Sequence, residues 1–492
     1  MKKLLTVTIV FLFFGLIITS SSGIQIDNKP VTNSNRGNTL YVGGSGPNNY
    51  TTIQSAIDDA SDGDTVFVYD DSSPYYEYIT VTKSINLTGE NRDTTIIDGM
   101  HIFYVIGVEA DWVNISGFTI RNSAEYNAGI VIGGYDYNTI TGNNIIPDRG
   151  NGIWFLHSNN NTITDNNIIS NYYGDGIYLQ LSDNHIITNN NISNSQHGIH
   201  EYHSIGNTIT YNNILNNSKY GIHLNPTSSN NIITGNNISN NDYGIYIDGS
   251  TKNIITDNSF FNDGIYVNTN KNVIDNNTVN GKSLVYLEGE SDVVIEVDAG
   301  QIILINCDNI TVQNQEISET DVGIELWNTN NCLISGNTIT SNNRYGIIVL
   351  NSTLNIITDN DISNNKNGIR LDSSSNNITS NNNIIYHNNF INNTQNAYDE
   401  CDNIWDDGKY GNYWSNYEED YPDAKKIISK GIWDTPYEIP GGDNQDNCPL
   451  IKPWPKTKSK HNSDSRAVLI SPLLRFLERY PLLNLLLQRL TT

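Results

Sequence analysis

The chain has 492 residues and carries 53 Asp and Glu residues against 27 Lys and Arg residues. The resulting formal net charge of −26 leaves no basic surface that could neutralise phosphate groups. Nucleic acids and anionic membrane lipids are therefore excluded as partners held by charge.

The N-terminus has the pattern of a secretory signal peptide over residues 1–23. Lys2 and Lys3 precede an apolar run from Leu4 to Ile18, and small residues from Ser20 to Gly23 follow it. The run is shorter than the roughly 20 apolar residues that a membrane-spanning helix needs. We expect the rest of the chain to be secreted or displayed at the cell surface. An uncleaved N-terminal anchor is the alternative.

Residues 38–110 are expected to form an N-terminal cap and the first coils of a repeat. Thr51-Thr52-Ile53-Gln54 has the pattern of a capping box and opens a short amphipathic helix that ends before Gly63. Four strands are predicted in this part of the chain: Val66–Val68, Ile79–Val81, Ile85–Leu87 and Thr95–Ile97.

Residues 111–397 repeat at a period of 22 to 24 residues, which is the property that decides the fold class. A Gly-Ile dipeptide recurs at this period, beginning at Gly129, Gly152, Gly176, Gly198, Gly221 and Gly244, and later at Gly323, Gly346 and Gly368. A second apolar position recurs at Ile140, Ile163, Ile187, Ile209, Ile233, Ile255 and Ile274. A third follows five residues later, at Ile145, Ile168, Ile192, Ile214, Ile238, Phe260 and Val279.

Short stretches in which Ile alternates with polar residues are typical of strands with one buried face. The Asn, Gly and Asp residues between them suit tight turns, because these types tolerate left-handed backbone. Identical residues at one period predict coils that stack in parallel and in register, with Asn ladders at the turns. The sequence therefore predicts an all-β protein, a single-stranded right-handed parallel β-helix.

After the repeat, residues 398–455 are aromatic and rich in Gly, and we expect them to form a C-terminal cap. A polar, basic linker (456–466) leads to a Leu-rich tail (467–492) that is predicted to form two short amphipathic helices joined at Pro481. The tail has three open interpretations: docking on a membrane surface or a partner protein, a sorting signal, or folding back on the β-helix.

The four cysteines suit an exported chain, in which disulfides are permitted. Cys401 and Cys448 bracket the C-terminal cap, so a disulfide between them is predicted. Cys307 and Cys332 lie on neighbouring coils and either pair or remain buried thiols. No Cys-x-x-Cys motif is present, so a zinc site of that type is excluded.

The residue two places after each Gly of the Gly-Ile dipeptide should point outward, because the intervening Ile points inward. Over six successive coils this column is aromatic: Trp154, Tyr178, His200, His223, Tyr246 and Tyr266. Polar residues two places further on should flank it: Gln180, Asn225, Asp248 and Asn268. We interpret the column as a ladder of flat rings that binds a polysaccharide or other glycan. The alternative is that strand surfaces favour aromatic residues in any case.

Four histidines are concentrated in two neighbouring coils: His197, His200, His203 and His223. If His200 and His223 stack, their rings lie close enough to share a metal ion. The alternative is a solvated or stacked pair without an ion. No cofactor is required by this interpretation, and calcium or copper is the metal to consider.

Catalysis is the less favoured hypothesis, although a lyase or glycoside hydrolase remains the alternative. A hydrolase needs two carboxylates on either side of the cleaved bond. The paired Asp residues of the chain all lie in the expected caps, which leaves Glu201 and Asp248 as weak candidates on the coils. We therefore expect a non-catalytic binding protein. A structural or adhesive surface protein is a further alternative.

Several motifs resemble a known family. The phrase Thr52–Ile57 followed by Gly63–Val66 resembles the entrance of pectin-lyase-like β-helices, and the coils resemble the repeats of a domain shared by carbohydrate-binding and sugar-hydrolysing proteins. The region Gly411–Tyr417 (Gly-Asn-Tyr-Trp-Ser-Asn-Tyr) is similar to exported proteins related to the periplasmic copper-binding protein NosD family.

That resemblance implies copper binding or a role as an accessory to a copper enzyme. Copper sites favour Cys, Met and His ligands. Because Met1 and Met100 are the only methionines of the chain, the copper in the family's name is expected to be inherited terminology.

Overall fold

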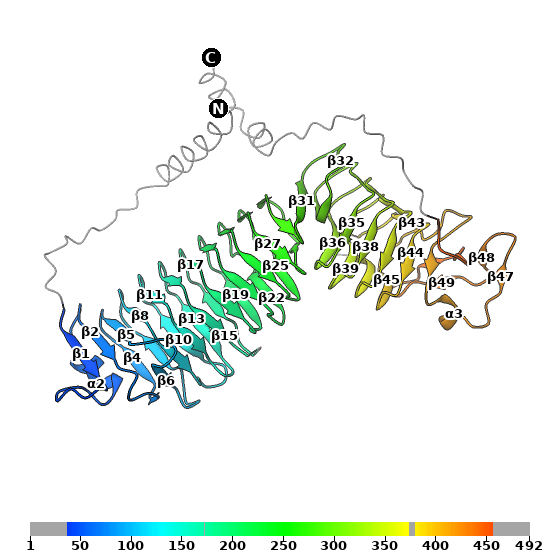
Figure 1. Ribbon diagram of the computed structural model, residues 1–492. Helices are drawn as coiled ribbons and strands as arrows, with labels where there is room; N and C mark the ends of the chain where they lie inside the picture. Colours follow the sequence, from blue (N-terminus) through cyan, green and yellow to red (C-terminus); the bar gives the residue numbers. More distant parts are fainter. Residues whose placement is uncertain (1–36, 172, 373–378, 456–492) are drawn as a thin grey trace, which may run out of the picture. The chain divides into compact units, whose positions relative to one another are not determined.

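The computed structural model describes residues 37–171, 173–372 and 379–455. The chain is all-β and forms a parallel β-helix, as the repeat predicts (Figure 1). The two helices of the described part are α2 (Ile53–Asp59) and α3 (Tyr417–Asp420), and neither is long enough to cross a membrane. The predicted signal peptide, linker and tail lie outside the described residues.

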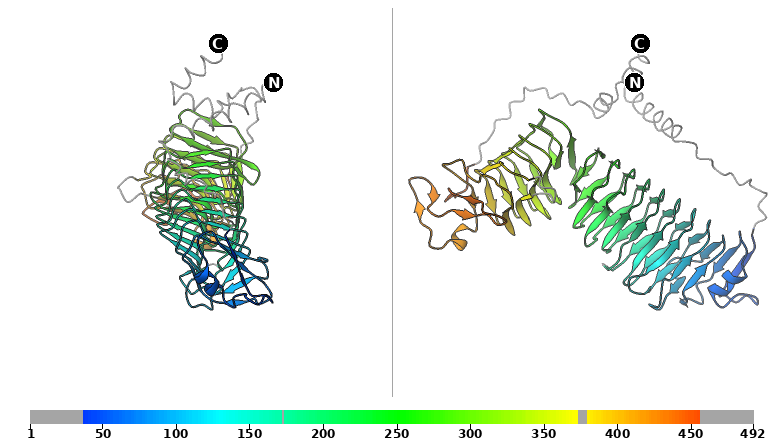
Figure 2. Two further views of the ribbon diagram at one scale, coloured as in Figure 1. Left: turned by 90° about the vertical axis from the view of Figure 1, so that its left-hand side faces the viewer. Right: turned by 180° about the vertical axis from the view of Figure 1, so that it is seen from behind.

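Three sheets run along the first stack of coils, and their strands lie side by side in all views (Figure 2). The strands of sheet A are β1 (Thr39–Val42), β2 (Thr65–Val68), β5 (Asn86–Gly89), β8 (Asn114–Ser116), β11 (Thr139–Thr141), β14 (Thr162–Thr164), β17 (Ile186–Thr188), β20 (Thr208–Thr210), β23 (Ile232–Thr234), β26 (Ile254–Thr256) and β29 (Val273–Asp275). The strands of sheet C are β4 (Ile79–Val81), β7 (Ile106–Val108), β10 (Ala128–Gly133), β13 (Asn151–Leu156), β16 (Ile177–Gln180), β19 (His197–Tyr202), β22 (Tyr220–Leu224), β25 (Tyr243–Ile247) and β28 (Ile265–Val267).

Sheet B is the longest sheet and continues into the second stack. Its strands are β3 (Tyr75–Tyr76), β6 (Ile96–Asp98), β9 (Thr119–Arg121), β12 (Asn144–Ile146), β15 (Asn167–Ile169), β18 (Asn191–Ser193), β21 (Asn213–Leu215), β24 (Asn237–Ser239), β27 (Ser259–Phe261), β30 (Thr278–Val279), β31 (Lys282–Glu288), β33 (Ala299–Ile305), β36 (Val322–Trp327), β39 (Tyr345–Leu350), β42 (Asn367–Asp372) and β45 (Gln395–Asp399).

Two shorter sheets, E and F, complete the second stack. Sheet E contains β32 (Val294–Ile295), β34 (Thr311–Gln313), β37 (Leu333–Ser335), β40 (Ile356–Thr358) and β43 (Ile384–Tyr386). Sheet F contains β35 (Glu316–Ser318), β38 (Thr338–Thr340), β41 (Asp361–Ser363), β44 (Asn389–Ile391) and β46 (Tyr413–Trp414). The small hairpins β47–β48 (Lys426–Ile427, Ile432–Trp433) and β49–β50 (Tyr437–Glu438, Gln445–Asp446) follow.

The predicted register is confirmed in the first stack. Ile140 pairs with Ile163, Ile163 with Ile187, and the column continues in register to Ile274 in sheet A. The column from Ile145 to Val279 behaves in the same way in sheet B. These side chains are buried and form one continuous apolar core, which stabilises the stack by removing apolar surface from water.

A buried Asn ladder runs beside this core at the turn between sheets A and B. Its members are Asn143, Asn166, Asn190, Asn212, Asn236, Asn258 and Asn277. Each of the first six side-chain amides donates to the next Asn side chain, and each amide of the ladder also donates to backbone carbonyls of the core strands. The residue before each Asn has positive φ, as at Asp165 and Asn189. The left-handed backbone therefore favours Asn, Asp and Gly at the position before each ladder residue. The buried side-chain amides donate to backbone carbonyls that would otherwise lack hydrogen-bond partners.

The two stacks meet at the antiparallel pair β30–β31. The Gly-Ile strands lie in sheet C in the first stack, from β10 to β28, but in sheet B in the second stack, where β36, β39 and β42 carry them. Glu325, Ile348 and Arg370 share one column of sheet B and are not in register with Tyr266. The Gly-Ile repeat therefore continues along the sequence from the first stack to the second, but its strands are divided between two sheets.

Elements that do not repeat lie at both ends of the described β-helix, namely α2 near its start and α3 with two hairpins after its last coil. Thr52 is the N-cap of α2 and accepts from the Ser55 N–H, so the cap lies one residue later than the predicted Thr51–Gln54 box. In the C-terminal cap, the Trp405 and Trp414 indole N–H groups donate to Asp399 and Asp446, each at 2.9 Å.

The predicted disulfide between Cys401 and Cys448 is not formed in the structure, where all four cysteines are free thiols. Each of the two is held in its own turn by a different carboxylate. The Cys401 N–H donates to Asp399 (3.0 Å), and the Cys448 N–H donates to Asp446 (2.9 Å). Cys307 and Cys332 are buried thiols, which is one of the two alternatives that the sequence left open.

Candidate functional site

The outward aromatic column of sheet C lies in register over six strands. Trp154 pairs with Tyr178, Tyr178 with His200, and the pairing continues through His223, Tyr246 and Tyr266. All six side chains are partly buried. These six residues therefore share one face of the sheet, as the repeat predicts.

The rings of this ladder mostly stack on one another. The centroids of Tyr178 and His200 lie 4.9 Å apart at an interplanar angle of 26°, and those of His200 and His223 lie 4.9 Å apart at 11°. Tyr246 stacks on Tyr266 at 5.0 Å, whereas His223 meets Tyr246 edge-on. Because these separations match the spacing of neighbouring strands, the ring faces are turned toward one another along the stack. The ladder presents mainly ring edges to the solvent.

A second column joins the ladder one residue before each Gly. It contains Asp175, His197, Tyr220 and Tyr243, and the last three occupy paired positions on β19, β22 and β25. His197 stacks on Tyr220 with a centroid distance of 5.1 Å and an angle of 10°. This column covers one flank of the ladder and brings a third imidazole beside His200 and His223.

Asp175 orients two of the three imidazoles. Its carboxylate accepts hydrogen bonds from His197 Nδ1 at 2.7 Å and from His200 Nδ1 at 2.8 Å. A carboxylate only accepts, so both rings carry their proton on Nδ1 and turn Nε2 away from Asp175. Burial alone would raise the pKa of Asp175, but the hydrogen bonds from His197 and His200 hold that pKa well below its usual value. The ionised carboxylate is thus a fixed acceptor for both rings.

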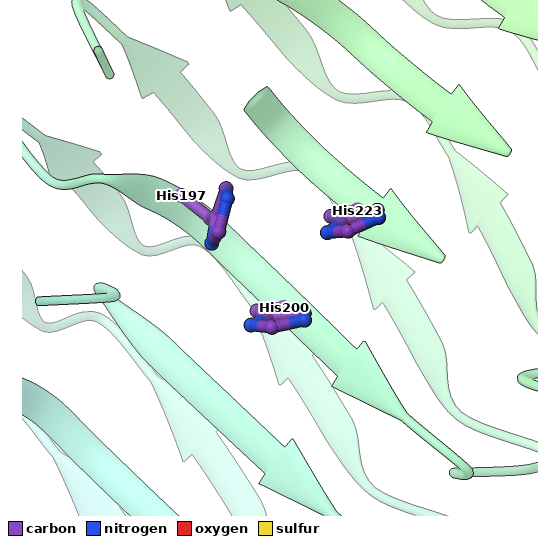
Figure 3. A group of neighbouring side chains, drawn as sticks. All are labelled: His197, His200 and His223. Carbon is purple, nitrogen blue, oxygen red and sulfur yellow. The ribbon is translucent and has the colours of Figure 1, made fainter. Parts of the chain in front are cut away.

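The three histidines present nitrogen atoms to one another. One ring nitrogen from each of His197, His200 and His223 lies within 4.8 Å of the other two (Figure 3). His200 Nε2 and His223 Nδ1 are buried and have no hydrogen-bond partner. Burial, together with the neighbouring His200 and His197, lowers the pKa of His223 to about 3, so this imidazole is neutral at ordinary pH.

This arrangement has the donor set of a transition-metal site. Neutral imidazole nitrogens suit copper, zinc and nickel. A histidine that binds a metal through one nitrogen commonly donates its other N–H to a carboxylate, which is the relation that Asp175 has to His197 and His200. The unpaired nitrogens of His200 and His223 are the groups that an ion would satisfy. Together, His197, His200 and His223 with Asp175 are called the histidine centre below.

His203, the fourth predicted ligand, does not join the centre. It lies on the turn after β19, where its backbone φ is 53°, and its ring pairs with the Thr227 hydroxyl. The ring edge also meets Tyr202 at 4.2 Å. Three of the four predicted histidines are therefore brought together, and the fourth points elsewhere because the strand ends before it.

The two weak catalytic candidates differ in their placement. Glu201 pairs in register with Leu179 and Leu224 and points into the core, where it is fully buried. It follows the outward His200 on the same strand, so alternation directs its side chain inward. This placement is wrong for a group that must meet a surface substrate. Asp248 is partly exposed beside the ladder and accepts from Asn268 at 2.9 Å.

Asp175 was not singled out by the sequence. Its signal was available, because the position before Gly carries Asp175, His197, Tyr220 and Tyr243 in four successive coils. His197 was predicted as one of four clustered histidines, but its position was not followed along the repeat, so Asp175 at the same position one coil earlier was missed. The position before Gly also faces the ladder, because Gly itself has no side chain to separate the two columns.

Two family models match the chain. The model described as right handed beta helix region matches residues 102–261 and contains the histidine centre. The model described as periplasmic copper-binding protein (NosD) matches residues 224–301 and 291–419. The NosD match thus begins just after His223, and any assignment of a metal to the histidine centre depends on its geometry. No curated relative matches the chain by sequence.

Solved structures give distant matches. A Dettilon tailspike protein is 14% identical with a TM-score of 0.38 and covers 66% of this chain and 67% of its own. A family 28 exopolygalacturonase from Yersinia enterocolitica is 12% identical with a TM-score of 0.38, covering 66% and 75%. A mannuronan C-5 epimerase A-module from Azotobacter vinelandii is 15% identical with a TM-score of 0.29, covering 72% and 92%. These values carry no information about the function of this chain.

Proposed function

We propose that this NosD-like right-handed parallel β-helix protein binds a transition-metal ion, copper foremost, at the histidine centre. The observation that carries the proposal is the pair of buried, unpartnered nitrogens on His200 and His223 beside a carboxylate that fixes His197 and His200. When bound, copper supplies a positively charged centre that can change its oxidation state. The chain itself supplies three imidazole rings and the ionised Asp175.

The test is a titration of the purified, metal-free full chain with Cu(II) and Zn(II), followed by equilibrium dialysis. One ion per chain is expected, with copper bound more tightly than zinc, as N-donor sites generally order these metals. A His200→Ala/His223→Ala variant should lose this ion, whereas a His203→Ala variant should retain it. Retention of the ion by the double variant would place the metal elsewhere and end this proposal.

Carbohydrate binding along the ladder is a second candidate. It is supported by the unbroken run of six rings on one face and by the flanking polar residues Gln180, Asn225, Asp248 and Asn268. Glycan-array binding by the full chain should be lost in a Trp154→Ala/Tyr178→Ala variant. Binding that survives the double substitution would remove the ladder as the glycan site.

We further propose that the protein is non-catalytic and that it is exported. Glu201 is buried in the core, and the Asp248 carboxylate accepts a hydrogen bond from the Asn268 side-chain amide. Incubation with polysaccharides should therefore produce no new reducing or unsaturated ends. Detection of the chain outside the cytoplasm, with its N-terminus shortened near residue 23, tests the export.

A further inference from the structure

A second aromatic feature lies away from the ladder, on the turns that lead into sheet A. Trp112 and Tyr137 lie two residues before the first residues of β8 and β11, and their rings stack with centroids 4.6 Å apart at an angle of 8°. Trp112 is 64% exposed and Tyr137 is 46% exposed. Large aromatic side chains that remain this exposed, paired on one corner, differ from the isolated exposed apolar residues that are normal on protein surfaces.

The backbone at these positions does not favour aromatic residues. Trp112 has φ of 62° and Tyr137 has φ of 60°, in the left-handed region that is uncommon for bulky side chains. In the following coils the same turn position is filled by Asn160, Asn184, Gly206 and Asn230, which are residue types suited to left-handed backbone. Lys252 and Lys271 hold the same position further along with φ of 62° and 66°, so left-handed backbone does not by itself mark a site. It is the stacking of two large exposed rings at this position that points to a function at the surface.

The stack leaves one ring face open. When the register of β8 with β5 and of β5 with β2 is extended by two residues, Ser84 and then Gly63 follow Trp112, so the neighbours on the side away from Tyr137 are small. Asp62 and Asp111 are exposed next to these residues. Asp62 accepts from the Ser84 N–H at 3.0 Å, and the Ser84 hydroxyl donates to the Asp111 carbonyl at 2.7 Å. Trp112, the small residues Ser84 and Gly63, and the carboxylates of Asp62 and Asp111 are together called the shelf. One carboxylate oxygen of Asp111 accepts from the Asp136 N–H at 2.8 Å, which leaves its second oxygen for a ligand.

We infer that this shelf is a binding site for a hexopyranose unit of a neutral glycan. The apolar face of the sugar ring would lie on the open face of Trp112, and the carboxylates of Asp62 and Asp111 would accept hydrogen bonds from sugar hydroxyls. The same carboxylates repel uronates and sulfated sugars, which excludes acidic polysaccharides. The site is distinct from the histidine centre and from the ladder, and it depends on neither.

The repeat itself provides a variant that should fold. In Trp112→Asn/Tyr137→Asn, both rings are replaced by the residue that the next coils use at this turn, so thermal unfolding should be unchanged or shifted upward. A Tyr211→Asn variant is the matched control, because Tyr211 is also exposed and left-handed (φ 55°) but packs over Gly235. A Trp112→Phe variant keeps a flat ring and should retain part of the binding.

The measurement is affinity electrophoresis of the full chain in native gels that contain galactomannan, xyloglucan or mixed-linkage β-glucan, compared with alginate and polygalacturonate. At least one neutral polymer should retard the wild-type chain and the Tyr211→Asn control, while the acidic polymers should not. Retardation should weaken about tenfold or more in Trp112→Asn/Tyr137→Asn and persist in Trp154→Ala/Tyr178→Ala and in His200→Ala/His223→Ala. The inference is overturned if no neutral polymer retards the chain, if acidic polymers retard it equally, or if the Asn double variant is retarded like the wild type.

Discussion

The side-chain amide of Gln301 takes the place of a backbone amide beside Ile265. It accepts a hydrogen bond from the Ile265 N–H at 3.0 Å and donates to the Ile265 carbonyl at 2.7 Å. Asp321 and Glu325 accept from the neighbouring N–H groups of Gly264 and Val267 at 2.9 and 3.3 Å. Sheet C has no strand beyond β28, and side chains of the second stack close the edge that would otherwise be free to pair with another chain.

A Gln301→Met variant tests this closure. It keeps the length of the side chain but leaves the buried N–H and carbonyl of Ile265 without partners, so the free energy of unfolding should fall by roughly 1–3 kcal/mol. Chemical denaturation measures the difference. Gln313→Met, on the exposed side of β34, should change stability by less than about 0.5 kcal/mol. Equal effects of the two substitutions would contradict the assigned role of Gln301.

The Asn ladder predicts opposite outcomes for two neighbouring residues. Asn212 is buried, donates to the carbonyls of Ile187 and Thr210, and is linked to the ladder members on both sides. Asn213 points outward and donates to Asn191 at 2.8 Å. Asn212→Ala should lower the free energy of unfolding by about 3 kcal/mol, because several buried groups lose partners, and Asn213→Ala by less than about 1 kcal/mol. Thermal or denaturant unfolding of both variants measures the two losses, and equal losses would contradict the role assigned to the buried ladder.

The buried carboxyl of Glu201 makes stability depend on pH. Burial raises its pKa from 4.5 to about 8, so the folded chain holds this proton at pH values where the unfolded chain has released it. The contribution is therefore greatest below about pH 4.5, declines as pH rises, and is fully lost above about pH 8. Glu201→Gln removes this dependence, and its stability advantage over the wild type should grow between pH 5 and pH 8 by several kcal/mol. The exposed Glu296→Gln serves as control, and a pH-independent difference for Glu201→Gln would refute the assignment.

Asp175→Asn tests the orientation of the histidine centre. The Asn oxygen can accept from one imidazole, but its amide N–H groups oppose the Nδ1–H of the other, so one ring must turn. The affinity for Cu(II) should fall 10- to 100-fold, as for other carboxylates that hold metal-binding histidines, with a changed EPR spectrum of the bound ion. Asp183→Asn, in which the native carboxylate holds the Ile205 N–H at 2.8 Å, should leave the spectrum unchanged. Unaltered affinity in Asp175→Asn would show that the hydrogen bonds do not prepare the site.

The free thiols lead to a simple mass measurement. Alkylation of the unfolded chain without reductant should modify all four cysteines. In the folded chain Cys448, which is partly exposed, should react before Cys401, and both should react slowly because burial raises the pKa of each thiol. A chain that accepts only two alkyl groups after unfolding carries a disulfide, and the turns around Asp399 and Asp446 would then have to rearrange.

The repeat was sufficient to predict the core columns, because a period of one coil places Ile163 above Ile140 whatever the details of the turns. The exchange of sheets after Val279 was not predicted, since Gly281 and Lys282 have the composition of any other turn in this chain. The histidines were predicted from their concentration in two neighbouring coils, and Asp175 was missed because the position before Gly was not followed from coil to coil. Side-chain packing determines how the rings of the ladder are oriented. The spacing of residues along the chain predicts which residues share a face, but not the orientation of their rings.

The internal Asn ladder continues through coils whose outer surfaces carry an indole, a phenol or an imidazole. Since each coil presents the same inner contacts to its neighbours, an outer residue can be exchanged without altering what holds the coil in place. A gene that duplicates or deletes one whole coil would keep every inner bond while changing the distance between two outer sites by one strand spacing. Insertion or deletion of whole coils therefore changes the distance between two binding sites in fixed steps, while the fold remains the same.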